Sequence, residues 1–141
     1  MDYILIDKDI VQFMPAFGAA LVVVQPGKLK ASGESTFKGK KVGVEGDEKE
    51  VEVPGCPYIS GAYTVPGTGT LKIAGLNSDQ IAQHTQTGGK KMLLKGSSFK
   101  AKFEVQTPAQ IPPPSSTPDP MTQYTGGTGM FITTNGTYKG T

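Results

Sequence analysis

The chain of 141 residues has no arginine, no tryptophan and a single cysteine, and each shortage argues against a class of function. All 14 basic residues are lysines. Two-point recognition of guanine or phosphate depends on the guanidinium fork of arginine, so the composition argues against a nucleic-acid-binding protein. The absence of tryptophan, with aromatic residues at only 8%, argues against an aromatic platform for carbohydrate.

Cysteine usage and the hydrophobic runs bear on compartment and membrane. The lone Cys56 cannot form a disulfide within the chain, which indicates maturation in a reducing compartment. The first residues carry acid where a secretory signal needs base, so we expect synthesis in the cytoplasm without a signal peptide. The apolar run at residues 17–24 is too short to span a membrane. We expect it to form one strand covered on both faces.

Alternation of apolar and charged residues predicts a mostly β fold. Residues 99–105 place apolar side chains on one face of a strand and charged ones on the other. Two arms of the same pattern in residues 41–53 flank Gly46 and Asp47, which predicts a hairpin. With 19 glycines and 11 prolines, the chain favours short strands and tight turns. We predict a compact antiparallel domain with one short helix, at residues 79–85.

Proline content divides the sequence into three parts. Residues 1–106 are predicted to form a β-rich core domain. Residues 107–120 contain six prolines and are typical of an extended strap or linker. Residues 121–141 form a Gly- and Thr-rich carboxy-terminal appendage with the alternation of one strand. We expect the strap to carry this last segment to another surface, either on the chain's own core or on a partner.

Cys56 and His84 are the candidates for chemistry. A cysteine and a histidine in contact supply a nucleophile and its base. No helix amino terminus or oxyanion device accompanies Cys56, so a structural thiol and a surface histidine are the preferred interpretation. The two residues fall short of the roughly four ligands that a zinc site needs. We therefore predict no catalytic residues and no cofactor, and leave any metal site unassigned.

Two groups of charged residues are interpreted as solvent-exposed surface. The acidic cluster lacks the spacing of a calcium loop, and two of its members alternate with valines on the outer face of a strand. Its residues are Glu45, Asp47, Glu48, Glu50 and Glu52. The lysines are interpreted as solvated faces that protect strand edges from pairing. Examples are Lys38, Lys40, Lys41, Lys90 and Lys91.

Two glycine-rich segments resemble PAAR and PAAR-like proteins. Residues 53–65, Val-Pro-Gly-Cys-Pro-Tyr-Ile-Ser-Gly-Ala-Tyr-Thr-Val, are similar to their Gly-Ser-x-Thr-Val hairpins. Residues 88–99, Gly-Gly-Lys-Lys-Met-Leu-Leu-Lys-Gly-Ser-Ser-Phe, are similar to the later Gly-Gly-x-Ile-x-x-Gly-Ser segment. The resemblance spans about residues 45–105. Members often hold a tip metal such as zinc with several histidines and a cysteine; this chain has only His84 and Cys56, so those ligands are not carried over.

The resemblance implies a structural protein without enzymatic activity. PAAR-like proteins form the pointed β cone on the trimeric spike of contractile injection systems and phage-like tails. The implied partners are that spike and an effector cargo, in a secreted or extracellular particle. The alternative is an adaptor or immunity-type binding module that recognises a partner by strand addition. A small hydrolase that uses Cys56 and His84 is the third hypothesis.

Overall fold

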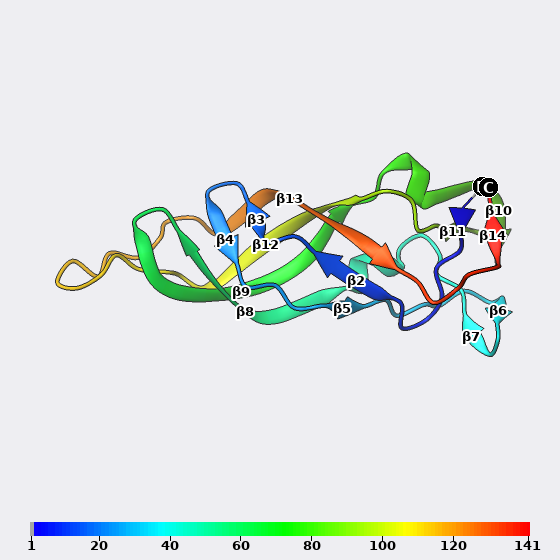
Figure 1. Ribbon diagram of the computed structural model, residues 1–141, viewed down its shortest axis with the longest axis horizontal. Coiled ribbons are helices and arrows are strands. Elements are labelled where there is room, and N and C mark those ends of the chain that lie inside the picture. Colours follow the sequence, from blue (N-terminus) through cyan, green and yellow to red (C-terminus); the bar gives the residue numbers. More distant parts are fainter. Residues whose placement is uncertain (1) are drawn as a thin grey trace.

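The computed structural model describes residues 2–141 as an elongated molecule built around one antiparallel sheet (Figure 1). Eight strands form this main sheet, in the spatial order β3-β4-β8-β9-β12-β13-β2-β5. Its long strands are β8 (Glu52–Ser60), β9 (Tyr63–Gly75), β12 (Phe99–Thr107) and β13 (Gln123–Ile132). Its short strands are β2 (Ile10–Phe13), β3 (Ala16–Phe17), β4 (Ala20–Val22) and β5 (Gly27–Lys28). The prediction of a mostly β fold is confirmed.

The main sheet curls around an aromatic core. Strand β3, at one edge of the sheet, contacts β13, and a side chain at Gly127 of β13 would overlap the ring of Phe17. Alternation along β12 turns Phe99, Ala101 and Phe103 inward, as the sequence predicts. The large aromatic side chains that fill the interior are Phe13, Phe17, Tyr58, Phe99, Phe103 and Phe131.

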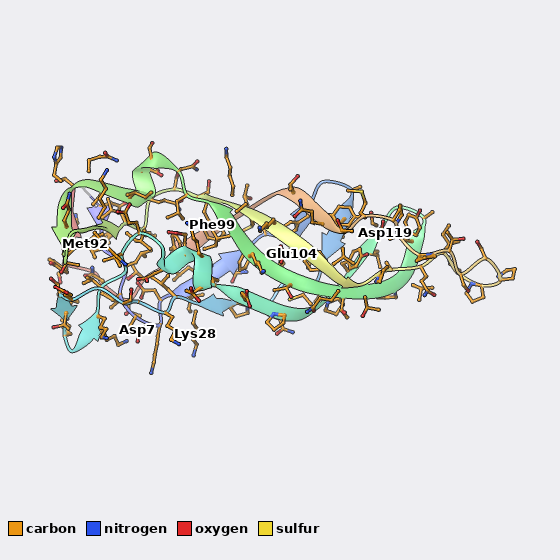
Figure 2. The ribbon with its side chains drawn as sticks, turned by 180° about the vertical axis from the view of Figure 1, so that it is seen from behind. Asp7, Lys28, Met92, Phe99, Glu104 and Asp119 are labelled. Carbon is orange, nitrogen blue, oxygen red and sulfur yellow. The ribbon has the colours of Figure 1, made fainter. Side chains whose placement is uncertain are left out.

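Three two-stranded ribbons lie at the end of the molecule that carries both termini (Figure 1). They are β1 (Asp2–Tyr3) with β14 (Lys139–Gly140), β6 (Thr36–Phe37) with β7 (Lys40–Lys41), and β10 (Ile81–Thr87) with β11 (Lys90–Leu93). A second, smaller core lies beneath them; its buried residues are Ile4, Ile6, Val42, Ala82, Met92 and Leu94. We call the end of the molecule that carries the three ribbons the ribbon end. Met92 lies near the ribbon end, and Asp119 lies near the opposite end of the molecule (Figure 2).

The predicted helix at residues 79–85 is wrong. A single 3-10 turn, η2 (Ser78–Gln80), is followed at once by strand β10. Asn77 is the amino-terminal cap of this turn, and Gln80, which completes the capping box, is fully buried. From Ile81 onwards the backbone pairs with β11, which a polar segment does more favourably than it forms an isolated helix of two turns. The helices among residues 2–141 lack the length and apolar character needed to cross a membrane.

The predicted hairpin across residues 41–53 is also wrong. Val42 and Val44 bridge to other parts of the chain, and Val53 pairs with Leu71 of β9. The Gly46-Asp47 pair leads into the other 3-10 turn, η1 (Asp47–Glu50), and does not close a two-residue hairpin loop. Alternation shows that a segment is a strand, but it does not say which strand lies beside it.

The apolar run at residues 17–24 is split rather than continuous. Gly18 adopts a positive φ of 60° and turns the chain between β3 and β4. Within β4, Ala20 and Val22 are buried while Leu21 is 58% exposed. The run therefore has one covered face, and its other face adds apolar side chains to the surface.

The proline-rich segment forms a loop at the far end from the ribbons (Figure 1). Gln110 bridges to Val65 of β9 and to Pro118 across the loop. Beyond the loop the chain returns along the main sheet as β13, between β12 and β2. Residues 121–141 thus supply a strand to the chain's own sheet and then, through β14, one side of a ribbon.

Candidate docking site

Three short segments form a closed cycle beneath the ribbons, which we call the strand ring: residues 4–6, 42–44 and 92–94. The last residue of each segment bridges to the first residue of the next. These antiparallel bridges are Ile6 with Val42, Val44 with Met92, and Leu94 with Ile4. Because the third bridge returns to the first segment, the pairing has threefold cyclic order within a single chain.

Backbone hydrogen bonds repeat the same order. At the middle of the segments, the amide of Gly43 donates to Leu5 O (2.8 Å), that of Leu93 to Gly43 O (2.9 Å), and that of Leu5 to Leu93 O (2.9 Å). A second set of three hydrogen bonds surrounds the first. The amide of Asp7 donates to Lys41 O, that of Glu45 to Lys91 O, and that of Lys95 to Tyr3 O. Six amide–carbonyl bonds in two complete cycles make this a geometric repeat and not a chance crossing of strands.

The chain leaves each ring segment in the same way. Two residues after each segment the backbone has a positive φ: 68° at Lys8, 100° at Gly46 and 55° at Gly96. In two cases the next residue is an aspartate whose carboxylate accepts the amide hydrogen of the segment's last residue: Asp9 accepts from Ile6 and Asp47 from Val44. The third copy departs from this pattern, because Leu94 donates to Gln80 O instead.

Each ring segment is entered from one ribbon. The registers place Tyr3, Lys41 and Lys91 at the equivalent position, directly before the ring. Two of the ribbons turn through a pair of residues with positive φ, which are Lys38 and Gly39 in one and Gly88 and Gly89 in the other. The third ribbon joins β1 to β14, from opposite ends of the sequence, and has no turn.

The centre of the ring is packed asymmetrically. Its middle residues are Leu5, Gly43 and Leu93, and both leucines belong to the main core. A Cβ at Gly43 would lie 3.0 Å from Leu29 Cδ2, so the Leu29 side chain fills the space that a third leucine would take. Threefold backbone order therefore coexists with one continuous core that joins the ribbon end to the main sheet.

Buried side chains hold the ring to the rest of the chain. Asn135, which is 2% exposed, donates from Nδ2 to Ile4 O (2.8 Å) and Tyr138 O (2.7 Å). Asp47 accepts from both the amide and the hydroxyl of Ser32. Each interaction fastens a different loop against a ring segment, which favours a rigid ring.

Replacing Asp9 is expected to change how stability depends on pH. Burial raises the pKa of Asp9 above its ordinary value of 3.8, against the opposing effects of its hydrogen bonds and of Lys40. The folded chain therefore holds this proton more tightly than the unfolded chain. The contribution of Asp9 to stability falls as pH rises from 3.8 through its folded pKa, and is constant above that.

The variant Asp9→Asn keeps an acceptor for the Ile6 amide and removes the charge. We expect its free energy of unfolding, measured in urea across this pH range, to increase relative to that of the wild type as pH rises. Parallel pH profiles for the two proteins would contradict the assignment.

The structure places Cys56 and His84 apart, on strands of different sheets. Cys56 is fully buried in β8, its thiol donates to Val53 O (3.5 Å), and burial raises the pKa of that thiol. His84 is exposed on β10, and its backbone amide donates to Thr141 O. Within residues 2–141, no group of three or more histidine, cysteine or acidic side chains is arranged to hold a metal ion.

The acidic cluster is divided between structural roles. Asp47 and Glu48 are buried in η1, where Glu48 accepts the amide hydrogen of Gly46. Glu52 points outward from β8 and forms an ion pair with Lys72 at 3.4 Å. Glu45, Glu50 and Glu52 are exposed as predicted, although Glu50 lies in η1 and not on a strand. The buried role of Asp47 in securing the ring left no sign in the sequence.

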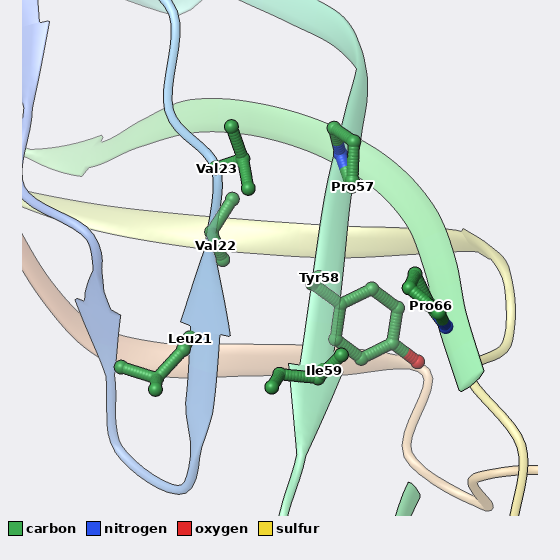
Figure 3. Close-up of a pocket in the computed structure, with 7 residues that line it drawn as sticks. All are labelled: Leu21, Val22, Val23, Pro57, Tyr58, Ile59 and Pro66. Carbon is green, nitrogen blue, oxygen red and sulfur yellow. The ribbon is translucent and has the colours of Figure 1, made fainter. Parts of the chain in front are cut away.

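An apolar depression lies beside strands β4, β8 and β9 of the main sheet (Figure 3). Leu21 and Val23 beside it are 58% and 63% exposed. Its lining residues are Leu21, Val22, Val23, Pro57, Tyr58, Ile59 and Pro66. The Tyr58 hydroxyl is turned to Asp119, so the depression has no polar group to orient a substrate.

The sequence does contain a signal for the ring, in the form of a weak repeat. Residues 3–9, 41–47 and 91–97 read Tyr-Ile-Leu-Ile-Asp-Lys-Asp, Lys-Val-Gly-Val-Glu-Gly-Asp and Lys-Met-Leu-Leu-Lys-Gly-Ser. The last two copies both follow Gly-Lys, and all three place apolar residues at their second and fourth positions. A search for internal repeats before strand assignment identifies this pattern.

Comparison with protein-family models places the chain in a family of known role. The model described as contractile injection system spike tip protein matches residues 1–141. A search of curated proteins finds no match. The match extends beyond the segments that resemble PAAR proteins and includes all three ring segments. The chain is therefore a β-rich structural component of an assembled injection particle, and it belongs to the contractile injection system spike tip family.

Proposed function

We propose that this chain caps the blunt end of a trimeric spike and docks through its ribbon end. The strand ring is the observation that carries the proposal. A single chain that sits on a threefold axis meets three identical surfaces, and it engages all three alike only if it presents a repeated surface itself. Three ribbons around a cyclic ring provide that repeat.

The ribbons also suit the docking chemistry. Short two-stranded ribbons can extend by backbone pairing onto strands of the spike. Docking at this end directs the proline-rich loop away from the spike (Figure 1), so the loop becomes the leading point of the particle. In this role the chain performs no chemistry, and Cys56 and His84 have no catalytic task.

The stoichiometry of the complex tests the proposal. The purified trimeric spike of the same particle is mixed with this chain and analysed by size-exclusion chromatography with light scattering. We expect a complex of three spike chains and one tip chain. A tip that elutes as a free monomer beside the trimer would overturn the proposal.

Bulky labels test which end docks. We expect a polyethylene glycol chain at Thr36→Cys, on the exposed β6 of the ribbon end, to prevent the complex. The same label at Ser115→Cys, in the exposed proline-rich loop, is the matched control and should leave the complex intact. Cys56 is fully buried, so it does not react with the maleimide that attaches the polyethylene glycol label. Blocking by the loop label alone would reverse the proposed orientation.

A further inference from the structure

The ribbon end carries a concentration of lysines. Of the 14 lysines in the chain, the three ribbons and their turns contain Lys38, Lys40, Lys41, Lys90, Lys91 and Lys139. The one carboxylate side chain in the same ribbons is Asp2, whose two oxygens accept the amide hydrogens of Tyr3 and Gly96. The three ribbons and their turns therefore carry six positive side chains and one negative one, although Glu34 lies against the turn at Gly88 and the whole chain has a formal charge of only +2.

These lysines have no acidic partner within residues 2–141. None of the six lies within 4.0 Å of a carboxylate oxygen, and two of them, Lys38 and Lys139, lie over the rings of Phe37 and Tyr3 instead. On the main sheet the arrangement is different. There Lys72 contacts Glu104 at 2.6 Å and Glu52 at 3.4 Å. The chain thus pairs Lys72 of its sheet with two carboxylates, whereas none of the six ribbon lysines has such a partner within residues 2–141.

The lysines also follow the threefold order of the ring. Lys40-Lys41 of β7 and Lys90-Lys91 of β11 occupy equivalent positions in two ribbons. In the third ribbon the equivalent residues are Asp2 and Tyr3, and the lysine stands on the opposite strand as Lys139, in register with Tyr3. Every ribbon presents at least one ammonium group, so each protomer of a threefold partner meets positive charge.

We infer that the partner surface at the ribbon end is acidic, with carboxylates supplied by each protomer of the spike. The inference rests on the proposed function. Protection of strand edges explains isolated lysines. In the docked complex, however, the surface of the spike must also cover the lysines of the ribbons. Covering unpaired ammonium groups with apolar or basic surface carries a large desolvation penalty, whereas a ring of carboxylates offsets that penalty and steers the tip onto the axis.

Salt and charge reversal test the inference. The affinity of the tip for the purified spike trimer is measured from about 50 mM to about 500 mM sodium chloride, a range in which exposed charges become screened. We expect binding to weaken at least about tenfold over this range, mainly through slower association. The variant Lys40→Glu/Lys90→Glu should weaken binding at low salt by about tenfold or more and flatten the salt dependence.

A matched variant controls for net charge. Lys28→Glu/Lys100→Glu changes the charge equally at two exposed lysines of the main sheet, on β5 and β12, and should bind as the wild type does. Equal unfolding midpoints verify that both variants fold. Reversal without effect, or an equal loss in the control, would overturn the inference while the complex itself persists. Absence of any wild-type complex would instead overturn the proposed function.

Anionic lipid vesicles separate the spike from the other acidic surface that lysines attract. We expect the wild type to bind the spike more tightly than vesicles that contain phosphatidylserine. If reversal abolishes vesicle binding and leaves spike binding unchanged, the lysines serve a membrane, and the inference is wrong.

Discussion

Replacing Phe103 with alanine is expected to lower the free energy of unfolding by about 3–5 kcal/mol. The Phe103 side chain is fully buried and lies between two other rings, with its centroid 5.1 Å from that of Tyr58 and 6.1 Å from that of Phe17. Gly69 of β9 packs against the same ring, since a Cβ there would overlap it. Truncation leaves a cavity where three strands meet, and rigid backbone on one side prevents its collapse.

Urea denaturation monitored by circular dichroism measures the loss. The variant Phe103→Leu retains most of the apolar volume and should lose clearly less than the alanine variant. An unchanged m-value would attribute the loss to the native core and not to a more compact unfolded state. If alanine and leucine cost the same, packing of the ring against Gly69 does not determine the stability.

Replacing Asp119 with alanine is the second large change that we expect, at about 2–4 kcal/mol. Asp119 is 4% exposed, and its Oδ2 accepts the hydroxyls of Tyr58 and Tyr124 while its Oδ1 accepts the amide hydrogen of Met121. Removing the carboxylate leaves the buried Tyr58 hydroxyl without its acceptor, and the Tyr124 hydroxyl keeps only Ser60 Oγ, at 3.0 Å. The proline-rich loop should then loosen, because the Asp119 network fastens its end to the sheet.

Two variants isolate the network from simple loss of volume. Asp119→Asn retains an acceptor oxygen and should cost less than alanine. Tyr124→Phe should cost less in the Asp119→Ala background than in the wild type, because one of the two hydrogen-bond partners of its hydroxyl is already gone. Faster proteolysis within residues 108–118 reports the loosened loop. Additive costs and an unchanged proteolytic rate would show that the carboxylate does not hold the loop.

The Asp119 network also affects the ionisation of the Tyr58 hydroxyl at high pH. Burial, together with the nearby Asp119, raises the pKa of Tyr58 from 10.0 to about 12. The folded state keeps this proton longer than the unfolded state does, so the contribution of Tyr58 to stability falls as pH rises from 10.0 to about 12. Loss of the Asp119 charge should lower this pKa, although burial remains its main cause.

Features that depend on neighbouring residues could be predicted from the sequence. Strand β12 was predicted because alternation in residues 99–105 is a local pattern that records which face is buried. The strand ring could not be predicted in this way, because each of its bonds joins segments far apart in the chain. The valines at residues 42–44 fit a local hairpin and a distant partner equally well, and tertiary pairing decided between them.

The candidate site shows the same division. Cys56 and His84 attracted attention by residue type, yet they lie in different sheets. The residues that build the proposed docking surface are ordinary by type. Its glycines, lysines and short aliphatic residues stand out only because they repeat in threefold order. Gly43 illustrates the difficulty, since its small size matters only because Leu29 from another loop occupies the adjacent space.

The ribbon of β1 and β14 has a consequence for biosynthesis. Asp2 pairs with Gly140, so β1 waits for β14 to be synthesised before this ribbon can close. The other two ribbons are hairpins that can form as soon as they are made. A chain truncated before β14 would lack this ribbon, and with it one of the three contacts that we propose for docking.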